Sequence, residues 1–131
     1  MTPAASDLYQ EQILDHYKHP KNKGPLPGAT FSARDTNPLC GDEVSFHLKV
    51  DRSERVSEVR FEGRGCAISQ ASASMLTTML KGLPLSEAEA LGDDALVKKL
   101  GISLSAVRLK CALLPLHVMR LAVREKKAAS T

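Results

Sequence analysis

Three cysteines carry the most specific chemistry in this sequence. The 131-residue chain has Cys40, Cys66 and Cys111, and an odd number of cysteines excludes a framework in which every thiol forms a disulfide. Each cysteine falls at a predicted junction between elements, where side chains are more exposed than in the middle of a helix or strand. Thiolates at such positions bind metal ions and accept sulfur, so the three residues are candidates for one shared site.

Asp42 is a candidate fourth ligand beside these thiols. It lies two residues after Cys40, with Gly41 between them. In an extended stretch, residues i and i+2 project to the same side, so the Asp42 carboxylate and the Cys40 thiol can reach the same ion. Three thiolates and one carboxylate form a four-ligand set that suits Zn²⁺ or iron.

Nearby positive charge favours the thiolate form of two of the cysteines. Cys66 opens a predicted helix, and the N-terminus of a helix carries a partial positive charge. Arg108 and Lys110 place basic side chains next to Cys111. The spacing itself is a weak signal, because the cysteines are far apart in sequence and the chain has no Cys-x-x-Cys pair. Unrelated buried cysteines therefore stay open as the alternative to metal or sulfur chemistry.

A β-hairpin is predicted to lead into this site. Apolar and polar residues alternate over 43–51, which is typical of a half-buried strand. A second strand of the same kind ends at Glu62, so the two strands form a hairpin with one face in water. Residues 31–35 predict a shorter strand before the hairpin. Two glycines break the pattern of the second strand just before Cys66.

Helices are predicted both before and after the strands along the chain. The helical spacing of apolar residues predicts helices over 7–18, 66–81 and 93–100. Ser86 and Glu89 have the spacing of a capping box, which predicts a short helix that opens at Ser86 and runs to Leu91.

The last predicted helix contains an internal conflict. Apolar residues recur every three or four positions from Leu104 to Leu121, which indicates a long helix packed on the hairpin. Pro115 lies inside this stripe and has no N–H group to bond the carbonyl of Cys111. We therefore expect the helix either to begin near Cys111 or to be kinked beside it.

The order of these elements predicts an α+β fold. One helix comes first, the strands follow, and a run of helices comes last. Strands segregated from helices form an antiparallel sheet, so we expect about three strands covered on one face by helices, with a long C-terminal helix. A chain of 131 residues has the length of one ordinary domain, and residues 1–131 are expected to form a single domain.

The composition excludes several classes of function. Aromatic residues make up 4% of the chain and tryptophan is absent, so a base-stacking platform for nucleic acid is not expected. The net charge of +3 is too small for an electrostatic nucleic-acid surface. No apolar run approaches the roughly 20 residues of a membrane span, and the N-terminus lacks the features of a secretory signal. We expect a cytoplasmic protein whose partners are neither nucleic acid nor a membrane.

Several stretches of the sequence resemble the U-type iron–sulfur cluster assembly proteins, which comprise IscU, SufU and the N-terminal part of NifU. The matching stretches are LDHY at 14–17, PKNKG at 20–24, NPLCGD at 37–42, FEGRGCAIS at 61–69, ASASM at 71–75 and RLKC at 108–111. The resemblance covers about residues 8 to 124. It implies that Cys40, Asp42, Cys66 and Cys111 are the metal and cluster ligands.

The subtype is SufU-like in its motifs. IscU proteins carry a histidine at the position of Lys110, just before the third cysteine. A lysine at this position resembles the SufU proteins. The stretches at 65–69 and 71–75 also resemble SufU. SufU proteins usually hold an insertion between the second and third cysteines, and this chain lacks it. The segment between Cys66 and Cys111 is similar in length to that of IscU proteins.

The SufU resemblance implies a zinc-binding protein that takes persulfide sulfur from a cysteine desulfurase of the SufS or IscS type. Cys111 is expected to accept the sulfur, supported by Arg108 and Lys110. The protein would then act as a sulfurtransferase together with the desulfurase and not as a stand-alone enzyme. Its other partners would be downstream cluster assembly proteins or recipient apo-proteins.

Two alternatives stay open beside this interpretation. The IscU resemblance implies a scaffold on which the same residues hold iron and then a [2Fe–2S] cluster that is passed on. A more remote alternative is a structural zinc module that binds a partner. The aspartate ligand argues against this module, because closed structural zinc sites prefer cysteine and histidine.

Overall fold

The computed structural model describes residues 5–37, 41–101 and 103–130, with side-chain surroundings from residue 11 to residue 124 within these ranges. The elements of the described chain are α1 (Ala5–Lys18), β1 (Phe31–Asn37), β2 (Asp42–Val50), β3 (Val56–Arg64), α2 (Ala67–Leu80), α3 (Leu85–Ala90), α4 (Asp93–Leu100) and α5 (Ala106–Ser130). The first helix begins at Ala5 and not at residue 7, whereas α4 has the predicted bounds.

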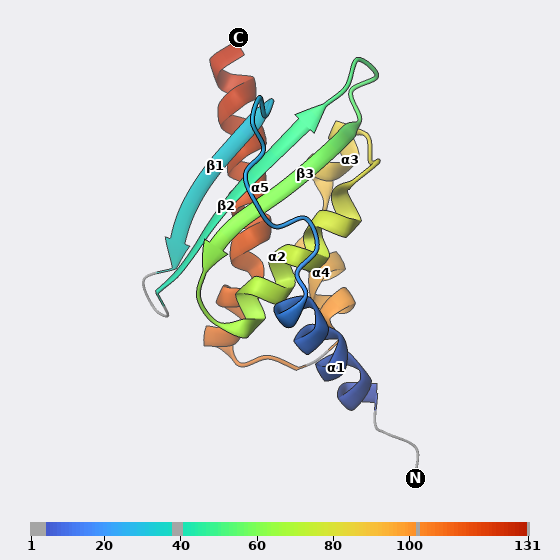
Figure 1. Cartoon of the computed structure of the whole chain (residues 1–131), viewed down its shortest axis with the longest axis vertical. Helices are drawn as coiled ribbons and strands as arrows, with labels where there is room; N and C mark the ends of the chain where they lie inside the picture. Colours follow the sequence, from blue (N-terminus) through green and yellow to red (C-terminus); the bar gives the residue numbers. More distant parts are fainter. Residues whose placement is uncertain (1–4, 38–40, 102, 131) are drawn as a thin grey trace.

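The strands form one antiparallel sheet in the order β1-β2-β3. Figure 1 shows α5 running behind the sheet, where it packs on β1 and β2, while α2 packs on β3. The helix α2 lies between α1 and α5 and contacts both. The predicted α+β fold, with three antiparallel strands, helices on one face and a long C-terminal helix, is confirmed.

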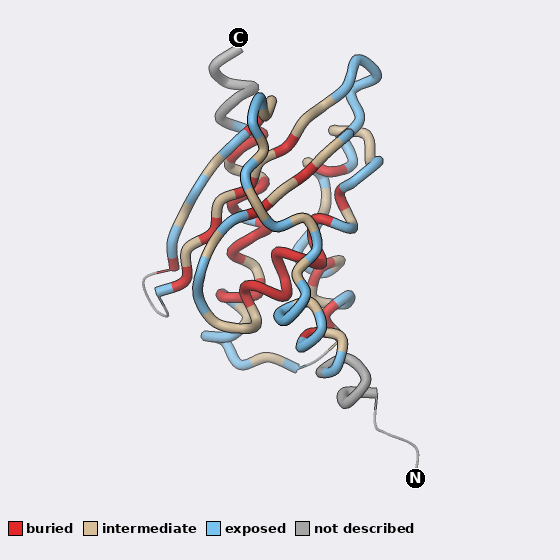
Figure 2. Tube along the Cα trace, in the orientation of Figure 1, coloured by how far each residue is buried: buried red, intermediate tan, exposed pale blue. Residues whose placement is uncertain are grey.

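The core lies between the sheet and this helical layer. Phe46 of β2 and Phe61 of β3 occupy paired positions, and their rings stack with the centroids 6.4 Å apart. Figure 2 shows that buried residues occur along the strands and along the helices behind them. The fully buried apolar residues in the same core cluster as the two rings include Val44, Leu48, Val59, Leu76, Leu80, Leu96, Leu116, Val118 and Met119. The alternation that predicted β2 therefore corresponds to a real inward face.

The opposite face of the sheet is polar, as the hairpin pattern predicts. His47, at the centre of β2, joins two neighbouring strands through its ring nitrogens. Its Nδ1 lies 2.8 Å from the Ser32 hydroxyl on β1, and its Nε2 lies 3.0 Å from a carboxylate oxygen of Glu62 on β3. Because these groups remain accessible to water, they tie the strands together without being buried.

The two edges of the sheet differ. Along the outer edge of β3, the loop after α1 adds two backbone hydrogen bonds. The N–H of Gly24 donates to the carbonyl of Phe61 over 2.9 Å, and the N–H of Phe61 donates to the carbonyl of Asn22 over 3.0 Å. At the opposite edge, no described strand lies beyond β1.

The helix α3 begins earlier than its sequence predicts. Its N-cap is Pro84, so Ser86 lies inside the helix and the predicted capping box is wrong. The reason is that the preceding backbone pairs with the start of β3. The N–H of Val56 donates to the carbonyl of Leu83, and the N–H of Gly82 donates to the carbonyl of Val56, each over 2.8 Å. This pairing fixes where the chain turns into the helix.

The helix α5 also begins earlier than expected. It starts at Ala106, one residue after Ser105, whose hydroxyl oxygen accepts the N–H of Arg108 over 3.3 Å. The helix continues through Pro115, so a start near Cys111 is wrong. The predicted stripe is also wrong at Val107, which is 50% exposed. The side that faces the core consists of Cys111, Ala112, Leu114, Leu116, Val118, Met119, Ala122 and Val123.

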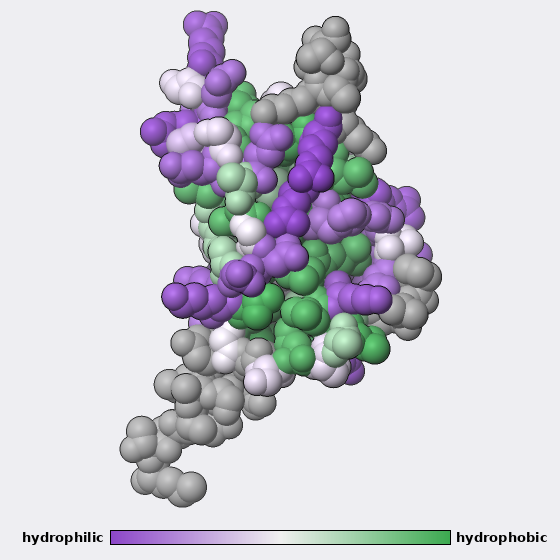
Figure 3. Space-filling view, turned by 180° about the vertical axis from the view of Figure 1, so that it is seen from behind, coloured by the Kyte–Doolittle hydropathy of each residue, from purple (hydrophilic) through white to green (hydrophobic). Residues whose placement is uncertain are grey.

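The outer surface of the helical layer mixes apolar and charged side chains. Seen from behind, green apolar groups lie between purple charged ones (Figure 3). The large apolar side chains exposed in the described part of the chain are Leu14, Tyr17 and Val107. None of the described helices combines the length and the apolar character that crossing a bilayer requires.

Candidate metal centre

Three predicted site residues meet at one end of the sheet. Asp42 begins β2, Cys66 lies in the turn between β3 and α2, and Cys111 lies in α5. One carboxylate oxygen of Asp42 and the sulfur atoms of the two cysteines all lie within 4.8 Å of one another. Cys40, the fourth predicted ligand, lies outside the described residues. The hairpin, the turn and α5 thus converge on one group of possible metal ligands.

The Asp42 carboxylate is held by the turn that leads into α2. Asp42 is fully buried, and its Oδ1 accepts the backbone N–H of Cys66 over 2.8 Å. Its Oδ2 accepts the thiol of Cys66 over 3.5 Å. Cys66 is the N-cap residue of α2, so the carboxylate occupies the position where a helix attracts negative charge. These contacts point the carboxylate toward the two thiols.

Two glycines allow the end of β3 to pass closely over the start of β2. Gly63 and Gly65 have φ angles of +157° and +148°. A Cβ atom on Gly65 would lie 2.1 Å from Oδ1 of Asp42, and one on Gly63 would lie 2.2 Å from the carbonyl oxygen of Glu43. In the sequence, both glycines indicate only the end of a strand. The closeness of Gly65 to Asp42 and of Gly63 to Glu43 depends on the strand register, which the local sequence does not reveal.

Cys111 is buried and does not lie at the start of a helix. Its relative exposure is 0%, because α5 begins at Ala106 and turns this residue toward the sheet. The expectation of an exposed junction is therefore wrong for Cys111, whereas Cys66 does lie at a junction and is partly exposed. The side-chain amide of Asn37 donates to the Cys111 sulfur over 3.9 Å. Asn37 opens the NPLCGD stretch, but no local pattern predicts its contact with Cys111.

The basic residues expected to support Cys111 are both exposed. Neither Arg108 nor Lys110 forms a side-chain hydrogen bond or ion pair with a described residue. Lys110 lines a shallow hollow of about 310 Å³ beside the centre. The other residues lining it are Asp35, Thr36, Asn37, Leu113, Leu114 and His117. Because the two cations face solvent, water weakens their field at the Cys111 sulfur.

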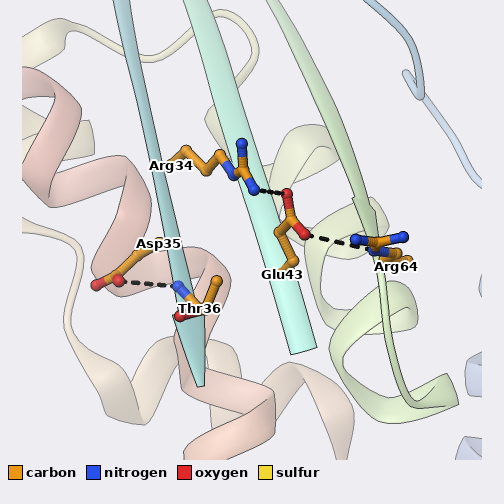
Figure 4. A network of polar contacts seen from close by, with 5 residues as sticks. All are labelled: Arg34, Asp35, Thr36, Glu43 and Arg64. Atoms are coloured by element: carbon orange, nitrogen blue, oxygen red, sulfur yellow. Dashed lines mark hydrogen bonds and ion pairs between the residues drawn. The ribbon is translucent and has the colours of Figure 1, made fainter. Parts of the chain in front are cut away.

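Charged side chains join the strands next to the centre. Glu43 follows Asp42 on β2 and forms ion pairs with Arg34 on β1 and Arg64 on β3 (Figure 4). The Arg64 Nε lies 3.4 Å from a Glu43 carboxylate oxygen. Near the same end of the sheet, His117 of α5 lies 3.4 Å from the Asp35 carboxylate. These pairs link the elements that carry Asp42 and Cys111.

The sequence as a whole matches a known family. Residues 8–130 match the family model described as NifU-like N terminal domain. The chain is 34% identical to the zinc-dependent sulfurtransferase SufU of Bacillus subtilis, and the match covers 94% of each protein. It is 35% identical to the iron–sulfur cluster assembly scaffold protein IscU of Aquifex aeolicus, over 89% of this chain and 74% of that protein.

The SufU match contains gaps on the side of this chain. It runs over 140 aligned positions, more than the 131 residues available here. The Bacillus subtilis protein thus has additional residues, in agreement with an insertion that this chain lacks.

Solved structures give the same relationship. A protein from Fervidobacterium islandicum, assigned as an iron–sulfur cluster assembly scaffold of the SUF system, superimposes with a TM-score of 0.76 and 26% identity, covering 92% of this chain and 99% of that one. A second structure, of a hypothetical protein, has the same TM-score and 28% identity, covering 91% and 98%. The resemblance seen in the motifs is confirmed over nearly the whole sequence, and the chain belongs to the NifU-like N-terminal domain family, with SufU and IscU proteins as its relatives.

Proposed function

We propose that this protein works in iron–sulfur cluster assembly as a zinc-binding acceptor of sulfur from a cysteine desulfurase. The observation that carries the proposal is the convergence of Asp42, Cys66 and Cys111 within 4.8 Å. Family membership supports the proposal, because the Bacillus subtilis relative that matches over 94% of each protein is named a zinc-dependent sulfurtransferase. As the single-domain prediction implies, residues 1–131 would carry this activity within one domain.

The donor set fits a zinc ion. In a tetrahedral site, two zinc-bound sulfurs, each about 2.3 Å from the ion, lie about 3.8 Å apart. The three described ligand atoms lie within 4.8 Å of one another, so small shifts of the side chains bring them to this spacing. Asp42, Cys66 and Cys111 would hold the ion together with Cys40. Bound Zn²⁺ would keep these thiols deprotonated at neutral pH.

The sulfur step would use Cys111 as the acceptor. In its thiolate form, the Cys111 sulfur attacks the outer sulfur of the persulfide on the desulfurase. A new S–S bond forms on Cys111, the S–S bond on the desulfurase breaks, and the desulfurase cysteine leaves as a thiolate. Because Cys111 is fully buried, this step requires the start of α5 to open toward the partner. The partly exposed Cys66 is the alternative acceptor.

A scaffold function is the second candidate. The same four residues would then hold iron and a [2Fe–2S] cluster as cargo, as the names of the IscU relatives suggest for those proteins. Lys110 counts against a cluster held in the IscU manner, because a protonated lysine has no lone pair for iron. A structural zinc module is a more remote candidate.

Two measurements on one anaerobic preparation test the proposal. We expect about one zinc per chain by metal analysis, and an increased turnover of a cysteine desulfurase when the zinc form is added. Mass spectrometry after turnover should find the added sulfur on Cys111. A stable [2Fe–2S] cluster that transfers to an apo-ferredoxin, without stimulation of the desulfurase, would instead assign the scaffold function.

Single substitutions test the shared metal centre. Replacing Cys66 with serine should abolish tight zinc binding, because it removes a soft ligand from the set. The corresponding variants of Cys40 and Cys111 should also lose stoichiometric zinc. Retention of one zinc per chain by all three variants would show that the residues do not share an ion.

A further inference from the structure

A second polar cavity lies beside the candidate metal centre. It has a volume of about 210 Å³, and we call it the Gln70 pocket. Its lining residues are Tyr17, Pro20, Lys23, Gly63, Arg64, Gly65 and Gln70. Asp42, Cys66 and Cys111 are not among them, so the pocket and the centre are separate. A volume of this size equals that of about seven water molecules, which is enough for one side chain with its backbone N–H.

The Gln70 side chain is the unusual feature of this pocket. Gln70 is 5% exposed, and neither its Nε2 nor its Oε1 has a hydrogen-bond partner among the described residues. Buried polar side-chain atoms usually have a partner, and a buried carboxamide that lacks one is costly. An apolar residue would serve better at this place if the amide had no use. Both amide atoms are closed to solvent, so the amide offers its donor and its acceptor to a molecule in the pocket once the Gln70 side chain turns toward it.

The charge of the lining favours a negatively charged ligand. Lys23 and Arg64 are exposed cations in the lining, and none of the described lining residues is acidic. Lys23 extends over the ring of Phe61, with its Nζ 6.0 Å from the centroid. The Arg64 Nε forms an ion pair with the Glu43 carboxylate (Figure 4). The Arg64 side chain is 85% exposed. A carboxylate in the pocket would gain charge-assisted hydrogen bonds from these groups.

The Oε1 atom of Gln70, a hydrogen-bond acceptor, distinguishes between a free carboxylate and an acidic residue of a polypeptide as the ligand. A free small carboxylate at neutral pH has only acceptor oxygens, so it would leave the Oε1 of Gln70 without a donor. An aspartate or glutamate within a polypeptide brings both a carboxylate and a backbone N–H. We propose that the Gln70 pocket binds an acidic residue of a partner polypeptide, with its carboxylate near Lys23 and Arg64 and its backbone N–H on Gln70.

The place of the pocket gives this binding a consequence. Gly65 lines the pocket and lies against Asp42, and it directly precedes Cys66. A partner that inserts an acidic residue here would therefore be held one residue away from the candidate metal centre. This inference does not depend on which metal the centre holds.

The test is a titration of the ¹⁵N-labelled full-length chain followed by NMR. The probe is aspartate blocked as its N-acetyl N-methylamide, and the matched neutral probe is the asparagine equivalent. Acetate at the same ionic strength is the third arm. We expect saturable shifts of the Gln70 side-chain amide and the Gly65 backbone amide with the aspartate probe. Affinity for either of the other probes should be about tenfold lower, since each lacks one of the two contacts.

Variants separate a specific pocket from general attraction. Gln70→Leu, which removes only the amide, and Arg64→Gln should each weaken binding of the aspartate probe about tenfold. Arg52→Gln removes the same charge from an exposed turn away from the pocket and should leave binding unchanged. Equal binding of the aspartate and asparagine probes, or unchanged binding by Gln70→Leu, would overturn the proposal. Equal binding of acetate would overturn the assignment to a polypeptide.

Discussion

At the scale of single residues, the candidate metal centre depends on groups that are not ligands themselves. Gly65 gives Asp42 the space it occupies, and Asn37 donates a hydrogen bond to the sulfur of Cys111. Residues that surround metal ligands set the orientation and the basicity of those ligands. Both residues therefore offer tests that leave every ligand in place.

Replacing Gly65 with alanine should damage the centre. The new Cβ would meet the Asp42 carboxylate, and the φ angle of +148° disfavours any residue with a side chain. We expect zinc affinity to fall and the free energy of unfolding to decrease by about 1–3 kcal/mol. Isothermal titration with zinc and chemical denaturation measure the two effects.

Gly82→Ala is the matched control for this variant. Gly82 also has a positive φ, +90°, but a Cβ there meets nothing within 4 Å. This variant should lose stability from backbone strain and keep its zinc affinity. If Gly65→Ala bound zinc as tightly as Gly82→Ala, the contact with Asp42 would have no role in the centre.

Removal of the Asn37 amide should weaken metal binding without removing a ligand. Asn37→Ala takes away the N–H group that bonds the Cys111 sulfur, and the loss of such a partner typically costs 10–100-fold in metal affinity. Thr36→Ala changes the exposed neighbour on the same strand and serves as the control. Competition with a zinc-binding dye measures both variants, and equal affinities would contradict this role.

The sequence allowed only part of the candidate centre to be predicted. Asp42 and Cys66 were recognisable because a turn and a helix start are local patterns. The roles of Asn37 and Gly65 were not, since they arise from contacts between strands and helices distant in sequence. The burial of Cys111 was missed for a similar reason, because the face that α5 turns inward depends on how it crosses the sheet.

At the scale of elements, local patterns predicted the strands better than the helix starts. Alternation located β2 and β3 because one face of the sheet is buried along its length. The residue at which a helix begins depends on contacts outside that helix. Before α3, for example, the backbone of Leu83 pairs with that of Val56. The apolar stripe in α5 failed at Val107 because the helix there extends past the sheet-facing residues and remains exposed.

The contact between α1 and α2 should make stability depend on pH. His16 of α1 lies 2.7 Å from the Ser74 hydroxyl of α2, and burial lowers its pKa below 6.5, with Lys21 and Lys99 adding to the shift and Asp15 opposing it. The unfolded chain then binds more protons near this pKa than the folded chain. The stability contributed by neutral His16 is complete above pH 6.5 and is lost as the pH falls toward the folded pKa.

The substitution His16→Gln tests this dependence. Glutamine can still hydrogen-bond to Ser74 but does not titrate. Between about pH 7.5 and about pH 5.5, the melting temperature of the unmodified chain should fall further than that of the variant. Both proteins are measured in chelator, so that protonation of the metal ligands does not contribute. Parallel curves for the two proteins would show that His16 does not control the acid response.

At the scale of the whole molecule, the fold should not depend on a metal at the candidate centre. The core around Phe46 and Phe61 is formed by three strands and the helices behind them, whereas the candidate centre lies at one end of the sheet. Small zinc fingers obtain about 10–16 kcal/mol of folding energy from their ion because they lack such a core. A chelator should lower the melting temperature here and leave most of the helical circular dichroism, and loss of that signal would contradict this prediction.

The edge of β1, beyond which no described strand lies, has a consequence for association between molecules. An uncovered strand edge can pair with a strand from another chain. Arg34 is the central residue of β1, so two copies of Phe31–Asn37 paired antiparallel about their centres would place one Arg34 opposite the other. Like charges directly opposite each other destabilise a strand pair. In this register the edge therefore discourages two copies of β1 from pairing with each other, whereas a strand without a basic residue at that position meets no such repulsion.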